Sequence, residues 1–156
     1  MNRIITLIFS CIATISCIAQ TSIKDSDVSQ GSTIALRFAN EYVALCSQRN
    51  GSEDDWIAKN KLVTNHFKSS YKKLIKSALK KDPELGLGFD PIFDAQDYPD
   101  KGFKIHSYDC KTGLVTLEGE DWADFILVLR VVKQKDKWLV DGSGVLNIPI
   151  NKRGKR

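Results

Sequence analysis

The sequence predicts an α+β fold in which N-terminal helices pack on a curved antiparallel sheet. Up to Asp82, apolar side chains recur at helical spacing, whereas after Gly102 they alternate from one residue to the next, as in strands. Because the helical patterns all precede the strand patterns, the helices can cover only one face of the sheet. A curved sheet wrapped around one long helix is the simplest arrangement of these elements.

The composition is that of one globular domain, expected over residues 32–150. The chain has 156 residues, of which 42% are hydrophobic and 27% charged, enough for a real core. Its net charge is +4, but four positive charges lie in the final stretch NKRGKR, which we expect to be a disordered tail over residues 151–156. Nucleic acid is therefore not an expected partner, because such charge usually lies on a folded face.

The first residues have the pattern of an export signal. Residues 1–19 contain Arg3 followed by an apolar run, with small residues Cys17 and Ala19 placed for cleavage after Ala19. This predicts a periplasmic or secreted protein. The segment TISC ending at Cys17 resembles a lipobox, so a lipid anchor on Cys17 is the alternative. Residues 20–31 are polar and unpatterned, and we expect a flexible leader. No later stretch has the ~20 apolar residues of a membrane-spanning helix.

Three helices are expected before the sheet. Ile34, Phe38 and Tyr42 indicate a first helix over residues 33–48, and a short second helix around Trp56 has an acidic start. The third helix begins after Thr64, a suitable N-cap, and is closed by Asp82 and Pro83. It has an apolar face opposite a ladder of lysines, Lys68, Lys72, Lys76 and Lys80. Such a ladder is typically the wet side of an amphipathic helix, with an anionic partner as the alternative.

Four strands are expected after Gly102. The first, FKIHSY, should point Phe103, Ile105 and Ser107 to one side and Lys104, His106 and Tyr108 to the other. A turn at residues 111–113 leads to LVTLEG, and the apolar strand DFILVLRVV should be central. The last strand lies in WLVDGSGVLNIPI, where the glycines predict a bulge or bend at residues 142–144.

The connector between the third helix and the sheet is rich in aspartate. Asp90 precedes Pro91, which predicts an N-cap and a single helical turn over residues 91–95. The spacing of Asp90, Asp94, Asp97 and Asp100 does not match a calcium loop, so no metal site is expected. For acid–base chemistry Asp97 is the best candidate, but capping and turn formation explain the carboxylates better.

Two cysteines remain after a signal cleavage, and a few polar or aromatic residues could line a cleft. In an oxidising compartment Cys46 and Cys110 are either a disulfide or two buried thiols, and sequence leaves both open. His106 is expected on a polar face, facing solvent or lining a cleft together with Tyr108. Trp122, within GEDWAD, is the tryptophan expected to line a groove.

Several segments resemble one bacterial family: YKKLIKSALKKD, FDPIFDAQDYP, KIHSYD and KWLVDGSGVLNIP. The chain is similar to the family called domain of unknown function 3828, which consists of small exported or lipoprotein domains. The resemblance implies the cone-shaped fold of the nuclear transport factor 2-like superfamily, which includes ketosteroid isomerase-like and dehydratase-like enzymes. It marks family-like positions without an assigned role, namely Asp90, Pro91, Gln96, Asp97, Trp138 and Asp141.

The expected function is non-enzymatic binding in the cell envelope. The partner would be a protein or a small ligand held by the concave face of the sheet, with an immunity-type role as one version, and no cofactor is expected. Trp122 would then lie at an exposed rim. The alternative is an isomerase- or dehydratase-like enzyme whose pocket is lined by Asp97, His106 and Tyr108. A structural lipoprotein domain tethered through Cys17 is the third hypothesis.

Overall fold

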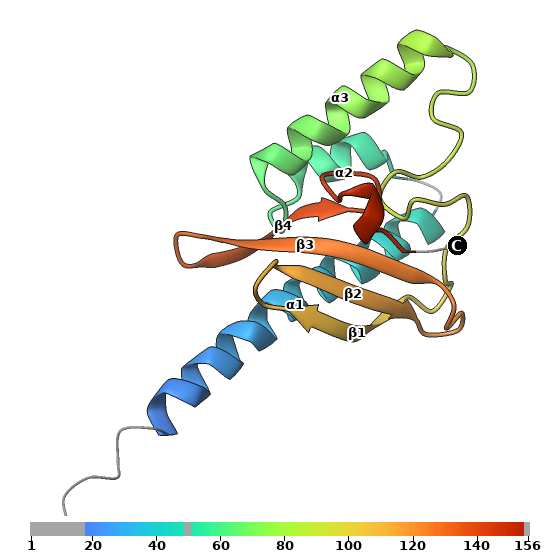
Figure 1. The fold of residues 1–156 in the computed structure, drawn as a ribbon. Helices are drawn as coiled ribbons and strands as arrows, with labels where there is room; N and C mark the ends of the chain where they lie inside the picture. The colour runs from blue at the N-terminus through green and yellow to red at the C-terminus, as the bar shows by residue number, and fades with distance from the viewer. Residues whose placement is uncertain (1–17, 49–50, 155–156) are drawn as a thin grey trace, which may run out of the picture.

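Three helices precede a four-stranded antiparallel sheet in the computed structural model (Figure 1), which describes residues 18–48 and 51–154, with side chains from residue 30. The helices are α1 (Ile18–Ser47), α2 (Glu53–Lys59) and α3 (Asn65–Lys81). The strands are β1 (Phe103–Asp109), β2 (Leu114–Gly119), β3 (Ile126–Gln134) and β4 (Lys137–Ser143), followed by a short 3₁₀ helix, η1 (Ile150–Lys152). The predicted α+β class is thus confirmed. The expected signal peptide and the lipid anchor on Cys17 lie outside the described residues.

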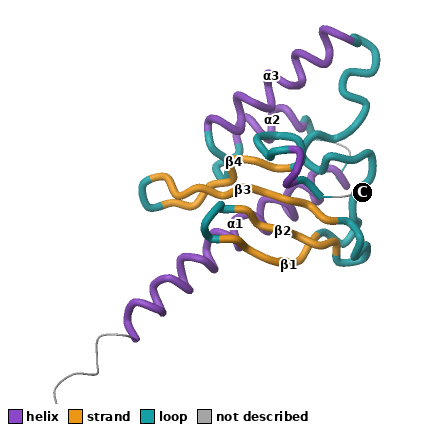
Figure 2. Tube along the Cα trace, in the orientation of Figure 1, coloured by secondary structure: helices purple, strands orange, loops and turns teal. Residues whose placement is uncertain are grey.

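The sheet is a simple meander with α1 packed along one face (Figures 1 and 2). Strand order is β1-β2-β3-β4 and each neighbouring pair is antiparallel, so the apolar β3 is an interior strand, as predicted. The core forms where one stripe of α1 meets the inner side chains of the sheet. From α1 it takes Ala35, Phe38, Ala39 and Tyr42, and from the strands Val115, Leu117, Leu127, Leu129, Val131 and Val140.

Helix α1 is longer than the sequence pattern indicates. It begins at Ile18, so residues 20–31 are helical, and the prediction of a flexible leader there is wrong. The segment contains no proline and only one glycine, Gly31, so nothing in it terminates a helix. Gly31 instead permits close packing, because a Cβ at this position would lie 3.1 Å from the Tyr108 hydroxyl.

Both shorter helices have a side-chain N-cap; the cap by Thr64 was predicted, and the cap by Ser52 was not. Ser52 Oγ accepts from the backbone N–H of Asp55, and Thr64 Oγ1 accepts from the N–H of Phe67 at 2.9 Å. Helix α3 ends at Lys81, with Asp82 as its C-cap, as expected. Only its first half is covered by the rest of the fold, and its second half extends beyond the sheet (Figure 1).

One unpaired residue interrupts the regular pairing in each of β1 and β4. His106 has no partner between the pairs Ile105–Leu117 and Ser107–Thr116, and Asp141 has none between Val140 and Gly142. The bulge at Asp141 lies one residue before residues 142–144, where the sequence predicted a bulge or bend. The bulge at His106 shifts the alternation, so Tyr108 pairs with the buried Val115 and faces the core. The prediction that Tyr108 shares a face with Lys104 is therefore wrong.

The chain end is held against the sheet at least as far as Gly154. The Arg153 guanidinium donates to the carbonyl oxygens of Ile148 and Val145, at 3.1 and 3.2 Å. Gly154 lies directly against Ile126, where a Cβ would collide with the carbonyl oxygen. A disordered tail over residues 151–156 is therefore incorrect for residues 151–154, because backbone acceptors satisfy Arg153. Residues 155–156 lie outside the described chain.

Candidate functional site

Two hollows follow α3, and they share the side chains of Ile75 and Leu79. The first, which we call the α2–α3 groove, encloses about 590 Å³ between α2 and α3. The second, which we call the acidic cavity, encloses about 420 Å³ between the second half of α3, the start of α2 and the connector from Leu85 to Pro91. Both depend on the part of α3 that the sheet leaves uncovered.

The α2–α3 groove has an apolar floor and two charged rims. Its floor is formed by Ile57, Ala58, Tyr71, Ile75 and Leu79. Asp54 and Asp55 border it on α2, and Lys68, Lys72 and Lys76 border it on α3. The Lys68 ammonium also bridges the two helices by donating to the carbonyl oxygen of Ala58 at 2.8 Å. Part of the lysine ladder therefore borders a groove.

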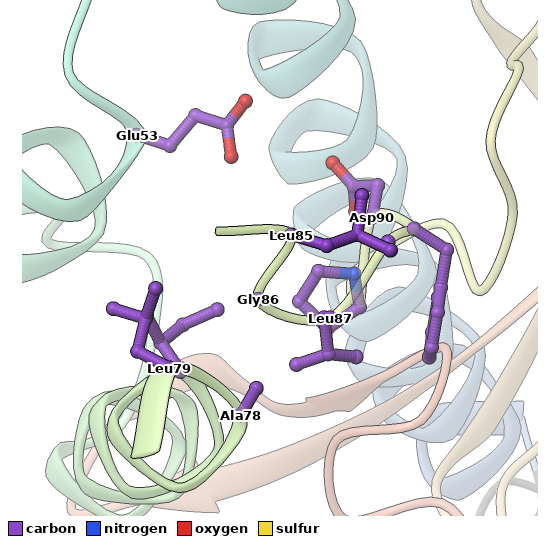
Figure 3. Close-up of a pocket in the computed structure, with 11 residues that line it drawn as sticks. Glu53, Ala78, Leu79, Leu85, Gly86, Leu87 and Asp90 are labelled. Carbon is purple, nitrogen blue, oxygen red and sulfur yellow. The ribbon is translucent and has the colours of Figure 1, made fainter. Parts of the chain in front are cut away.

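The acidic cavity is apolar on one side and anionic on the other (Figure 3). In this view the carboxyl groups of Glu53 and Asp90 lie on one side, while Ala78, Leu79 and Leu87 lie on the other. Exposed apolar side chains gather around it: Leu79 is 48% exposed, Leu85 70% and Phe89 38%. A surface that leaves such residues in water is often an interaction site.

The Asp90 carboxyl group is fixed in the cavity by three hydrogen bonds. Its Oδ1 accepts from the backbone N–H groups of Ile92 and Phe93 at 2.7 and 2.9 Å, which confirms the predicted cap. Its Oδ2 accepts from the Tyr42 hydroxyl at 2.7 Å, a contact the sequence did not reveal. Burial raises the pKa of Asp90, and these hydrogen bonds oppose that shift. Burial, followed by the Asp90 charge, raises the pKa of Tyr42, which therefore remains a donor.

Two more acidic groups crowd against Asp90. The Cys46 thiol, one Glu53 carboxyl oxygen and one Asp90 carboxyl oxygen lie within 4.8 Å of one another. Desolvation and then the Asp90 charge raise the pKa of Glu53, and they raise that of Cys46 to about 12. Among the described residues, no lysine or arginine forms an ion pair with Glu53 or Asp90. A positively charged group would therefore be favoured here.

The residues proposed for an enzymatic pocket do not come together. Asp97 and its neighbour Gln96 are exposed, and Gln96 donates to the carbonyl oxygen of Gly88 at 3.1 Å. His106 is exposed on the outer side of the sheet, with its Nδ1 3.1 Å from a Glu118 oxygen. Tyr108 faces the opposite side, toward α1. These side chains do not line the cavities along α3.

The remaining candidates are spread over the fold. Trp122 is 47% exposed and packs edge-on against Phe125, with ring centroids 5.1 Å apart, so it lies at an exposed position as the binding hypothesis requires. Trp138 is half-buried against the core, with the Lys133 ammonium 5.9 Å from its ring centroid. Pro91 is buried and borders the acidic cavity.

Asp141 joins the start of α3 to the last strand. Its carboxyl group accepts from the Thr64 hydroxyl at 2.5 Å and lies 3.2 Å from Nδ1 of His66. The Asn147 amide donates to the backbone carbonyl oxygen of Asp141 at 2.6 Å. The bulge at Asp141 thus places a carboxylate where it orders the N-terminus of α3, which is a structural role.

Cys46 and Cys110 are free thiols, so the disulfide considered for them is not formed. Cys110 follows β1 directly, and Tyr108 near the end of β1 lies beside Gly31. Cys46 lies fifteen residues further along the same helix than Gly31, a distance of about 22 Å at the rise of an α-helix. The Cα atoms of a disulfide lie within about 7 Å of each other.

Sequence reasoning missed Tyr42, Glu53 and the apolar mouth of the cavity. Tyr42 reads as one more core position of a helix, and Glu53 as part of an acidic helix start. The only usable signal was the segment LGLGF, in which Leu85, Leu87 and Phe89 alternate with glycines. In the structure, Leu85 and Phe89 of this segment are exposed and line the acidic cavity.

The chain matches no family model, no curated protein and no solved structure. Its resemblance to the domain of unknown function 3828 family therefore stays a prediction. Helices packed on a curved antiparallel sheet are consistent with a cone of the nuclear transport factor 2-like kind. No helix among the described residues has the length and apolarity needed to span a membrane.

Proposed function

We propose that the protein is an exported, non-enzymatic binding module that takes the apolar body of a small ligand into the α2–α3 groove. One observation carries the proposal: a groove of about 590 Å³ with an apolar floor and polar groups at its rims. Ligand sites are typically hollows of roughly 300–1,000 Å³, mostly apolar and with few polar groups. Export rests on the pattern of residues 1–19.

This location differs from the concave sheet face that the sequence suggested. The sheet face toward α1 is filled by the core, where Phe38 and Tyr42 meet the inner side chains of β2 and β3. The hollows instead lie along α3. The second half of this helix extends beyond the sheet (Figure 1). The ligand site is therefore assigned to the helical side of the fold.

The acidic cavity also supports binding over catalysis. A general base needs an oxygen that is free to take a proton from the substrate. Asp90 has Oδ1 engaged by two backbone donors and Oδ2 by Tyr42. Breaking the bond to Tyr42 would leave a buried hydroxyl without that partner. Asp90 is therefore better suited to present a fixed negative charge than to transfer protons.

An isomerase- or dehydratase-like enzyme is the second candidate. It is favoured by the raised pKa of Asp90, because a carboxyl shifted by burial beside a cavity is a common feature of acid–base sites. Turnover of a substrate that is lost in Asp90→Asn, while a bound ligand is still held, would support it.

Titration with the neutral fluorescent probe N-phenyl-1-naphthylamine tests the binding function. We expect saturable binding at one site, weakened at least threefold by Leu79→Ser, because Leu79 lines both hollows. Ile150→Ser is the matched control, since Ile150 is an exposed apolar residue, 82% accessible, on η1. The proposal fails if binding does not saturate, or if both variants weaken it equally.

A further inference from the structure

We propose that the acidic cavity selects the charged end of the ligand, so that the ligand is an aliphatic amine whose chain lies in the α2–α3 groove. The ammonium group would lie between the carboxyl groups of Glu53 and Asp90. This inference rests on the proposed binding function and adds the chemical class of the ligand.

Shared side chains connect the two hollows. Ile75 and Leu79 lie one turn apart on α3 and line both of them. The start of α2 also borders both hollows. Glu53 lines the acidic cavity, and the next residue, Asp54, lines the α2–α3 groove. A flexible chain that covers Ile75 and Leu79 can therefore have its end in the acidic cavity.

The charge distribution at that end favours a cation. Asp90 is anchored by three hydrogen bonds, and Figure 3 shows the Glu53 carboxyl group across the cavity from apolar side chains. Within the described part of the chain, neither carboxylate has an ion-pair partner among the lysines and arginines. An ammonium ion would supply the missing positive charge to both.

A ligand with a carboxylate has to be tested as well, because the lysines of α3 give one rim of the α2–α3 groove a positive charge. Lys72 and Lys76 border the α2–α3 groove, so a carboxylate could in principle be held there. These two lysines are exposed, and so is Glu53, whereas Asp90 is partly buried and fixed by three hydrogen bonds. Charges interact more strongly where water is excluded, so the acidic end should dominate the choice of ligand.

The probes are three compounds with the same chain: hexylammonium, hexanol and hexanoate, titrated at neutral pH with EDTA present to remove metal ions. Binding is followed by amide chemical shifts. We expect hexylammonium to bind at least fivefold more tightly than hexanol, and hexanoate to bind most weakly. Glu53→Gln should reduce the preference for hexylammonium over hexanol to less than twofold.

Glu84→Gln is the matched control. It makes the same substitution and removes the same charge from the exposed start of the connector, but Glu84 lines neither the acidic cavity nor the α2–α3 groove. It should leave the preference for the ammonium unchanged. If both variants reduce the preference for hexylammonium over hexanol equally, the effect comes from the general loss of negative charge, and the inference is wrong.

The remaining outcomes separate this inference from the proposed function. If hexanol binds as tightly as hexylammonium and Leu79→Ser weakens both, the groove binds ligands but the cavity does not select amines. If hexanoate binds most tightly, the lysine rim makes the selection and the inference is wrong. If none of the three compounds binds while N-phenyl-1-naphthylamine still does, the inference is wrong and the proposed function stands; if N-phenyl-1-naphthylamine does not bind either, both fail.

Discussion

Replacing Tyr42 by phenylalanine tests how the acidic cavity is built. The change keeps the buried ring and removes only the hydroxyl that donates to Asp90 Oδ2 at 2.7 Å. A hydrogen bond to an ionised group contributes about 1.5–3 kcal/mol to stability. Because Asp90 keeps its two backbone donors and part of its contact with water, we expect a loss of about 2 kcal/mol.

Urea unfolding followed by tryptophan fluorescence measures this loss, since the Trp56 ring lies 5.5 Å from that of Tyr42. At roughly 2–4 °C per kcal/mol for a chain of this size, the melting temperature should fall by about 6 °C. Tyr98→Phe is the control: its ring stacks on Phe93, and among the described residues no hydrogen bond is recorded for its hydroxyl. Tyr98→Phe should lower the free energy of unfolding much less than Tyr42→Phe.

The loss should also depend on pH. The bond from Tyr42 stabilises the ionised form of Asp90 and so lowers its pKa, opposing the rise caused by burial. Removing the hydroxyl therefore raises the pKa of Asp90 further. The difference between wild type and Tyr42→Phe should be largest at neutral pH and shrink as acid protonates Asp90. Equal losses in Tyr42→Phe and Tyr98→Phe, or a loss that does not change with pH, would refute this reasoning.

Three further predictions concern other parts of the fold. Burial raises the folded-state pKa values of Asp90 and Glu53, so the free energy of unfolding should rise as pH falls from neutral through those values. Urea unfolding of Glu53→Gln should show a smaller rise, because this variant lacks one of the two carboxyl groups. An aromatic disulfide reagent should label the exposed Cys110 much faster than Cys46, whose pKa of about 12 keeps it a thiol; equal rates would contradict the structure. Gly144→Ala should destabilise the fold by about 2 kcal/mol or more in the same melts, because φ is +54° and the new Cβ would lie 2.5 Å from a carbonyl oxygen; an unchanged midpoint would show that the backbone adjusts.

Local chemistry made much of the fold predictable. Thr64 caps α3 because its hydroxyl reaches an N–H three residues ahead, and Asp90 caps its turn in the same way. The change from helical to alternating apolar spacing located the sheet, and the continuous apolar run identified β3 as an interior strand. Each of these features depends on residues close together in the chain.

Features that depend on packing were harder to predict. The bulge at His106 reverses the facing of Tyr108, and strand alternation cannot show where such a bulge occurs. Arg153 looked like part of a solvated tail because its acceptors are backbone carbonyl oxygens, which leave no trace in the sequence.

The candidate site was the least predictable part. Its carboxylates come from the start of α2 and from the connector, and the Tyr42 hydroxyl that orients Asp90 comes from α1, 48 residues away. Sequence predicted the cap role of Asp90 correctly, but not that its second oxygen holds a buried tyrosine. The exposed Leu85 and Phe89 of the connector were the one local sign of a binding surface.

Mapping where hexylammonium binds, by amide chemical shifts of the whole chain, tests the proposed ligand site most directly. We expect the largest shifts in α2, in the second half of α3 around Leu79, and in the connector around Asp90, with little change in the strands. If the shifts cluster around Trp122 and the outer side of the sheet instead, the groove and the acidic cavity are not the ligand site.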